Sequence, residues 1–575
     1  MNLLICALIK QTIKKMILKK FSVLFLLLIL ITTFYSCSET PDAIYVNGKI
    51  YSMDNDNKVY EAMAIKDGKI IDIGTTDQIN SDYKSEDVTD LQGAVVLPGL
   101  IDSDGSIIEF SKNLNFINLS YAKSIREILD LIIEKTKTTK EGEWIGGYGW
   151  NELNIPESEL VTINKEMLDE IAPNYNVYLV NATFSTVWTN SRLLRFLQVD
   201  ANTPSPENGE IEKDANGNPT GLFFDNAVNI VKNNIPGLMK SEMESQVLKG
   251  LNEIAKYGIT SVHDRTVGED GIQIFRKLID EKKFPIRVYA VLSGEDSSLI
   301  NTYLSKGPEI NYGERMTIRA VTLDYDGQFD LQDAYMTDEY KNEPKVKIPY
   351  VSESEIENLY TLADEKGFQF SIKAVGDKAV STSLDIFEKI NKQKDIKDNR
   401  TIIEYCEFVN PKDFSRISDL KIIPSIRPDV GIFDLQIVSQ LINPENANKL
   451  GLWNSLIKSA GKITTGSDFP FHQINPFVQM YYLTTRQLSD TVLNTIANPD
   501  QKISITDAVR SYTVWPAYAS FEEDTKGTLE KGKLADFIVI SNDIFNSSPK
   551  ELLKTTVTKT IVNGRVIYDR SKERN

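Results

Sequence analysis

Eight short apolar segments, separated by stretches with helical periodicity, most constrain what this chain can fold into. They lie at residues 95–106, 259–263, 286–292, 318–325, 368–375, 401–405, 421–426 and 462–468. Helical patterns fall between them, as at residues 241–256 and 355–365. Strands that alternate with helices predict a parallel sheet, and eight such units predict an α/β fold of the (β/α)8 TIM-barrel type. Residues 111–236 lie outside this alternation.

Both ends of the chain have a different pattern, in which short strands alternate with turn signals. Asn47-Gly48 and Asp67-Gly68 separate short strands near the N-terminus, and Asn563-Gly564 does the same near the C-terminus. Such Xaa-Gly pairs favour two-residue hairpin turns because both residues tolerate a positive φ. The sequence therefore predicts β-hairpins at both ends.

The first 36 residues predict a signal peptide. Four lysines precede an almost wholly apolar run of eleven residues, 21–31, which is short for a membrane span of about 20 residues. The run leads to Cys37, and the preceding residues resemble a bacterial lipobox. We therefore expect lipidation at Cys37 and a membrane-anchored protein of the bacterial cell envelope, on the outer membrane, in the periplasm or exposed at the surface. The alternative is an uncleaved anchor helix.

Charge and cysteine content exclude several kinds of partner and site. The formal net charge is −17, which argues against nucleic acid as a partner. Of the three cysteines, Cys6 lies in the signal peptide and Cys37 would be acylated. Cys406 is then alone, so we expect neither an intramolecular disulfide nor a thiolate metal cluster.

Four motifs occur in order along the chain: Leu-Pro-Gly-Leu-Ile-Asp-Ser at 97–103, Gly376-Asp377, Gly466-Ser467-Asp468 and Gly-Lys-Leu-Ala-Asp at 532–536. Together they resemble the amidohydrolase superfamily, and within it amidohydrolase family 3. The resemblance implies a barrel over residues 98–524 with an insertion at 111–236. It also implies a small β-sandwich built from residues 43–97 and 525–570. The implied activity is hydrolysis of amide and other non-peptide C–N bonds by zinc or a similar divalent metal.

The family's metal-binding positions are filled by other residue types. Asp104 and Ser106 stand where the first strand of the family has two histidines, and Lys373 and Tyr405 replace histidines on the fifth and sixth strands. Thr322 stands where the fourth strand has a lysine that can bridge metals. Asp468 is retained, in the position of a residue that binds metal and handles the proton of the attacking water.

These replacements remove the donors that a binuclear metal site needs. Lysine offers a cation without a lone pair, and the chain contains two histidines in all, His263 and His472. We therefore expect no metal cofactor. The alternative is a weak mononuclear site on the oxygens of Asp104, Asp468 and Asp326.

A buried carboxylate pair that has lost its metal needs another positive charge. We therefore predict that the Lys373 ammonium pairs with Asp104 and Asp468. Further pocket candidates are Asp326, Arg427 as a holder of an anionic ligand, and His472. Phe184-Ser185 aligns with a family motif that faces substrate, and His263 is interpreted as structural.

Three functions remain open. The first is a catalytically degenerate, lipid-anchored protein that binds a small ligand or a partner. The second is a metal-free hydrolase in which Asp468 is the base and Lys373 or Tyr405 the electrophile. The third is residual metal-dependent hydrolysis on an oxygen-only site.

Overall fold

The computed structural model describes residues 40–120, 122–152, 155–235, 240–341, 348–394, 396, 399–487 and 498–573. The predicted signal peptide and the lipidation position Cys37 lie outside these residues. Within the described part of the chain, no helix combines the length and apolarity that a membrane crossing requires.

An eight-stranded parallel barrel forms the centre of the molecule. Its strands, in spatial order, are β8 (Leu100–Gly105), β15 (Ile259–Val267), β16 (Arg287–Ser293), β18 (Met316–Asp324), β19 (Gln369–Ala374), β20 (Ile402–Tyr405), β21 (Ile423–Ile426) and β22 (Thr464–Thr465). The first and last strands meet through two backbone hydrogen bonds, Asp468 N to Asp104 O at 2.8 Å and Ser106 N to Phe469 O at 2.9 Å. The barrel is thus nearly closed, and the predicted α/β barrel fold is confirmed.

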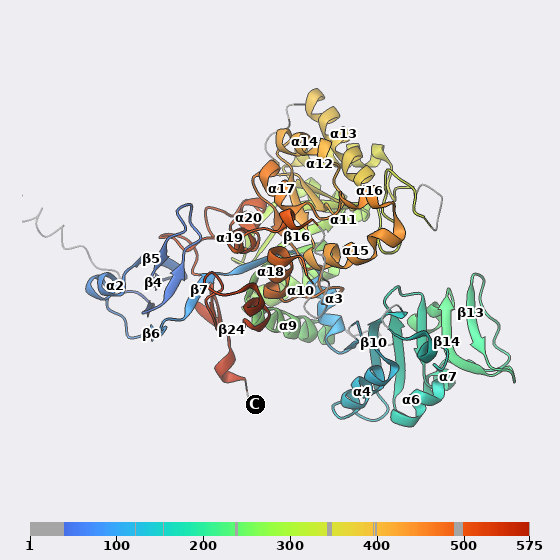
Figure 1. The fold of residues 1–575 in the computed structure, drawn as a ribbon. Helices are drawn as coiled ribbons and strands as arrows, with labels where there is room; N and C mark the ends of the chain where they lie inside the picture. Colours follow the sequence, from blue (N-terminus) through green and yellow to red (C-terminus); the bar gives the residue numbers. More distant parts are fainter. Residues whose placement is uncertain are drawn as a thin grey trace, which may run out of the picture.

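Helices cover the outside of the barrel (Figure 1). They include α9 (Lys240–Lys256), α10 (Glu269–Asp280), α12 (Glu353–Lys366), α13 (Asp377–Gln393) and α15 (Pro428–Leu441). Local chemistry sets their ends: Ser352 and Glu355 form a reciprocal capping box at the start of α12, and Gly367 ends it at φ 77°. Both helices predicted from periodicity, at 241–256 and 355–365, are present.

Two further sheets contain the strands near the ends of the chain. One contains β5 (Lys69–Gly74), β4 (Ala62–Lys66), β1 (Ala43–Val46) and β6 (Val88–Asp90). The other contains β25 (Arg565–Asp569), β24 (Val557–Val562), β23 (Phe537–Ile540), β7 (Val95–Pro98), β2 (Lys49–Tyr51) and β3 (Val59–Tyr60). In this second sheet the N-terminal β7 pairs with the C-terminal β23, so both chain ends build it (Figure 1).

Two of the three predicted hairpins form. Asp67-Gly68 connects the antiparallel strands β4 and β5, and Asn563-Gly564 connects β24 and β25, with positive φ at all four residues. The prediction for Asn47-Gly48 is wrong, because β1 pairs with β4 and β6 whereas β2 pairs with β3 and β7. Here the left-handed Asn47, at φ 57°, carries the chain from one sheet to the other.

The segment after β8 folds around its own sheet, away from the sandwich (Figure 1). Its strands are β13 (Gly209–Lys213), β14 (Pro219–Asp225), β12 (Thr186–Thr189), β11 (Asn176–Asn181), β10 (Trp144–Trp150) and β9 (Ile117–Asn118). Separate apolar clusters pack on this sheet, one of them around Trp188 and another around Phe223. This segment therefore has its own core.

Candidate functional site

The candidate site lies where the barrel strands end. Asp104 is on β8, Thr322 on β18, Lys373 on β19 and Tyr405 is the last residue of β20. Arg427 directly follows β21, and Asp468 lies three residues after β22. The carboxyl ends of barrel strands are where this fold places its working residues, and these six predicted residues lie at or near those ends.

The centre of the site is a buried ion pair that the sequence analysis did not predict. Arg427 donates from Nε to Asp104 Oδ2 at 2.7 Å, and its Nη2 donates to the same oxygen. Its Nη1 donates to Ser425 Oγ at 2.9 Å and to Ile426 O at 3.1 Å. The exposed fractions of the two paired side chains are 0% for Arg427 and 3% for Asp104. Burial raises the pKa of Asp104, and the charge of Arg427 opposes that rise.

The predicted pairing of Lys373 with Asp104 and Asp468 is wrong. Within the described residues, the carboxylate that lies within 4.0 Å of Lys373 Nζ is that of Asp324, at 4.0 Å. Arg427 reaches Asp104 instead, with a longer, forked side chain that extends from the end of β21 past β22 to β8. The cation that pairs with Asp104 in the structure is therefore Arg427 and not Lys373.

A second arginine, Arg265 on β15, extends the charge network. It hydrogen-bonds Asp324 through Nη2 and forms an ion pair with Glu404 through Nε. Thr322 Oγ1 donates to Glu404 Oε1 at 3.2 Å. Neither Arg265 nor Glu404 was predicted from the sequence. The signal that could have indicated Arg265 is its position just after His263-Asp264, at a strand end. Three cations, Arg265, Lys373 and Arg427, therefore face four carboxylates, those of Asp104, Asp324, Glu404 and Asp468, at the ends of seven of the eight barrel strands.

Tyr405 contacts both Asp468 and two of the cations. Its hydroxyl donates to Asp468 Oδ2 at 2.6 Å. The Lys373 ammonium and the Arg427 guanidinium each lie 4.9 Å from the centre of its ring, within the range of cation–π attraction. Burial, followed by the charge of Asp468, raises the pKa of this phenol well above its ordinary value, so Tyr405 is a neutral donor.

The backbone at these strand ends is strained. Tyr405, Cys406 and Asp468 have φ values of 68°, 48° and 56°. Non-glycine residues rarely occupy this left-handed region, and such outliers cluster where a side chain must be aimed at a site. The strain directs the hydroxyl of Tyr405 and the carboxylate of Asp468 toward each other.

Two other predicted pocket residues have structural roles. The Asp326 carboxylate accepts hydrogen bonds from the backbone N–H groups of Val375, Gly376 and Tyr335, each at 2.8 Å, and burial raises its pKa to about 7. Ser106 caps helix α3 (Ile107–Asn113), accepting from Glu109 N at 3.5 Å. Neither side chain belongs to the charge network.

The two histidines differ in environment. His472 is partly exposed at the mouth, with Nε2 3.9 Å from Asp468 Oδ2 and Nδ1 3.6 Å from Asp429 Oδ2. His263 is buried, its ring centre lies 5.2 Å from that of Tyr289, and burial lowers its pKa to about 3. His263 is therefore neutral and part of the barrel interior.

A buried acidic pair that the sequence analysis missed lies beside the site. Glu407 follows β20, Asp434 is on α15, and their carboxylate oxygens have no hydrogen-bond donor among the described residues. Burial raises the pKa of Glu407 to about 8, and it raises the pKa of Asp434 well above its ordinary value. The pair therefore holds at least one proton at neutral pH.

An aromatic pair connects the insertion to the barrel mouth. Phe184 of the insertion and Phe471, which precedes His472, pack edge to face with ring centres 6.4 Å apart. Their exposed fractions are 46% and 48%. This contact places the predicted segment Phe184-Ser185 beside the loop that follows Asp468.

The donor set does not fit a divalent metal. Among the residues that the structure describes, no group of three or more His, Cys, Asp or Glu side chains could hold one. Asp104 is occupied by Arg427, Asp468 by Tyr405 and Asp326 by backbone N–H groups. Arginine and lysine cations close to these oxygens would also repel a metal ion.

Comparison with known proteins identifies the family. A nearly closed (β/α)8 barrel with ionisable groups at its strand ends and a sheet shared by both chain ends matches amidohydrolase-type barrels. The sequence matches the amidohydrolase family over residues 87–568, and the chain belongs to this family.

Individual relatives span almost the whole chain. The N-substituted formamide deformylase of Arthrobacter pascens is 24% identical over 553 residues, covering 93% of this chain and 99% of that protein. The protein LONG AFTER FAR-RED 3 of Arabidopsis thaliana is 27% identical over 543 residues, covering 92% and 91%. An uncharacterized metal-dependent hydrolase from Pyrococcus horikoshii aligns with a TM-score of 0.71 and 23% identity, covering 88% of this chain and 99% of that one.

Proposed function

We propose that this amidohydrolase-family protein is metal-independent and binds a small ligand at the barrel mouth without hydrolysing it. The observation that carries the proposal is the fully buried fork from Arg427 to Asp104. This cation compensates the carboxylate charge that a divalent metal would otherwise balance. The network thereby lacks a Lewis acid to activate water.

The mouth offers groups suited to holding a small molecule. Asp468, His472 and Asp324 are partly exposed, at 16%, 29% and 28% of their side-chain area. The Phe184–Phe471 pair adds an apolar surface beside them. A few polar groups next to aromatic side chains are typical of small-molecule sites, so we infer a ligand that has a polar head and an apolar or aromatic part.

A metal-free hydrolase is the second candidate. The observation in its favour is the short hydrogen bond from Tyr405 to Asp468, with His472 Nε2 3.9 Å from the same carboxylate oxygen. Asp468 would take the proton of a water molecule, and the Tyr405 hydroxyl or the Lys373 ammonium would stabilise the developing oxyanion. The residual metal-dependent route is disfavoured by the donor set described above.

One activity assay separates these candidates. The test substrate is an N-substituted formamide, chosen because a relative of this chain carries the name N-substituted formamide deformylase. Amine release is measured for the wild type and for Asp468→Asn, with and without added Zn²⁺ or Mn²⁺. We expect no turnover above buffer in any condition. Metal-stimulated turnover that Asp468→Asn abolishes would contradict the proposal, and metal-independent turnover with the same dependence would favour the second candidate.

Ligand binding is tested by native mass spectrometry of protein purified under mild conditions. We expect a co-purifying small molecule on the wild type that is reduced in Lys373→Met, which removes a charge at the site but keeps the apolar stem. Lys412→Met, an exposed lysine on the short helix η2 (Pro411–Asp413), is the matched control. Equal occupancy, or none, in all three proteins would contradict binding at this mouth.

We also propose that Cys37 carries a lipid that anchors the protein to the bacterial cell envelope. Support comes from the basic and apolar segments that precede this cysteine. An anchored binding protein of this kind would hold its barrel mouth in the aqueous phase next to the membrane.

A further inference from the structure

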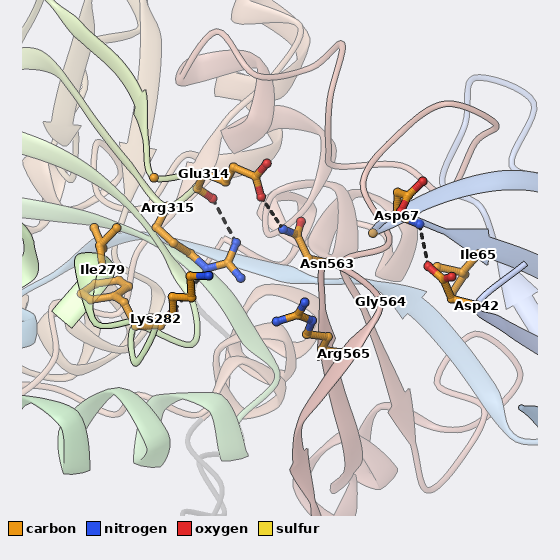
Figure 2. Close-up of a pocket in the computed structure, with 13 residues that line it drawn as sticks. Asp42, Ile65, Asp67, Ile279, Lys282, Glu314, Arg315, Asn563, Gly564 and Arg565 are labelled. Carbon is orange, nitrogen blue, oxygen red and sulfur yellow. Dashed lines mark hydrogen bonds between the residues drawn. The ribbon is translucent and has the colours of Figure 1, made fainter.

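A cavity of about 660 Å³ lies between the barrel and the two sheets formed by the chain ends (Figure 2). Barrel residues on its wall include Phe284 and Arg315, which precede β16 and β18. Asp324 of the candidate site is at the other end of β18, so the strand separates the two places by about 30 Å. The cavity is therefore independent of the barrel mouth.

Three cationic side chains point into the same part of this cavity: Lys282, Arg315 and Arg565 (Figure 2). In the described part of the chain, none of them has a carboxylate oxygen within ion-pair distance. This is unusual in a protein that has 81 acidic residues against 64 basic ones. The lining also contains three acidic residues, Asp42, Asp67 and Glu314, so the charges balance overall while the three cations are gathered at one end.

Arg315 is the most constrained of the three. Its Nε donates to Phe284 O at 3.2 Å and its Nη1 to Glu314 O at 3.0 Å, so backbone carbonyls orient the guanidinium without neutralising it. Burial, followed by the charge of Arg287, lowers the pKa of Arg315. The protein therefore holds a fixed, partly buried cation, on which the charges of Asp536 and Glu314 act without an ion pair to either carboxylate.

The far wall of the cavity is acidic. Asp42 accepts a hydrogen bond from Asp67 N at 2.7 Å, and Figure 2 shows both beyond Gly564, on the side away from the three cations. The third acidic residue, Glu314, lies next to Arg315 instead, and Asn563 Nδ2 donates to its Oε2 at 3.1 Å (Figure 2). The cavity is consequently bipolar, with its positive end built from three separate chain segments.

We propose that this cavity binds a small ligand through a phosphate group, with the phosphate at Lys282, Arg315 and Arg565. Two guanidinium forks match phosphate oxygens in geometry, and three cations balance a dianion better than a monoanionic carboxylate. The volume suits a small organic molecule, and the acidic wall favours a ligand whose remainder is neutral or cationic.

Such a phosphate could belong to a soluble phosphomonoester or to a lipid headgroup. Asp42 lies five residues after Cys37, so the cavity can lie at most about 17 Å of chain from the lipidation position proposed above. Both sources share the same recognition chemistry, and the experiment below separates them.

The test uses inorganic phosphate as the probe and isothermal titration calorimetry as the measurement. We expect saturable 1:1 binding that weakens at least tenfold in the double variant Lys282→Gln/Arg565→Gln. Both positions are exposed, so folding is expected to be retained and is checked by circular dichroism. Lys283→Gln removes a neighbouring charge that pairs with Glu281 and should bind like the wild type. Absence of saturable binding, or equal loss in the control, would overturn the proposal.

Vesicle flotation then identifies the source of the phosphate. Cys37→Ser protein, which lacks the acylation position, is mixed with phosphatidylcholine vesicles with or without phosphatidic acid. Flotation only with phosphatidic acid, reversed by free phosphate, assigns the site to a lipid headgroup. Calorimetric binding without flotation assigns it to a soluble phosphate ester.

Discussion

Replacing Arg427 by methionine tests the central ion pair. The Asp104 carboxylate has 3% of its area exposed and accepts two hydrogen bonds from Arg427. Removing one partner of a buried pair leaves an uncompensated charge and costs about 3–5 kcal/mol. Adding Asp104→Asn removes that charge, so the double variant should recover about 2–3 kcal/mol of coupling energy.

The chain offers its own reporter for this measurement. Cys406 is a buried free thiol next to Tyr405, and burial raises its pKa to about 12. It should react with a thiol reagent only when this end of the barrel opens. A loss of about 3–5 kcal/mol accelerates labelling by roughly 100- to 5,000-fold when opening and reclosing are fast relative to the reaction of the exposed thiol.

Arg126→Met is the matched control, because Arg126 pairs with Asp130 on the surface, with 79% and 52% of the side chains exposed. An exposed pair contributes about 0–1 kcal/mol, so labelling of Cys406 should be nearly unchanged. The reasoning is refuted if Arg427→Met labels like this control, or if Asp104→Asn fails to suppress its effect.

Three further predictions concern pH, Tyr405 and the anchor. The pKa of Glu407 is raised to about 8 by burial and is about 4.3 in an unfolded chain, so between these values the folded state holds a proton that the unfolded state has lost. The free energy of unfolding should therefore fall as pH rises from about 4.5 to 8, by up to about 1.4 kcal/mol per unit, and Glu407→Gln should flatten that slope in urea titrations. Tyr405→Phe removes a hydrogen bond to a carboxylate and should cost about 1.5–3 kcal/mol by Cys406 labelling, whereas Tyr312→Phe, whose acceptor Asp280 is exposed, should cost less. Cys37→Ser should move the protein from the membrane to the soluble fraction of an expressing bacterium.

Each of these predictions has a contradicting outcome. An unchanged slope in Glu407→Gln would mean that Glu407 does not carry the extra proton of the folded state. Equal labelling rates for Tyr405→Phe and Tyr312→Phe would mean that the hydroxyl of Tyr405 contributes nothing to the network. Membrane retention of Cys37→Ser would favour an uncleaved anchor helix.

The barrel was predictable from sequence because each strand is marked locally by an apolar run and a polar end. Residues 318–325 and 368–375, for example, became β18 and β19. The Asn47-Gly48 turn was predicted wrongly, since a turn signal specifies a local φ and not which strands pair. β1 and β2 each gain more from partners distant in the chain than from each other.

The partners within the site were not predictable in the same way. Asp104 and Arg427 are 323 residues apart, and which cation reaches a given carboxylate depends on strand register, side-chain length and backbone bends such as that at Tyr405. Lys373 lies near the end of β19 and Arg427 directly follows β21, and the sequence could not rank them. Arg265 and Glu404 were missed because charged residues at strand ends look alike until their neighbours are known.

Elemental analysis of the full-length protein, purified without chelator and then incubated with Zn²⁺ or Mn²⁺ and desalted, tests the central claim most directly. The account predicts a metal content far below one ion per folded chain before and after incubation, because arginine already compensates the carboxylates. One or two tightly held ions per chain, lost in Asp468→Asn, would contradict it.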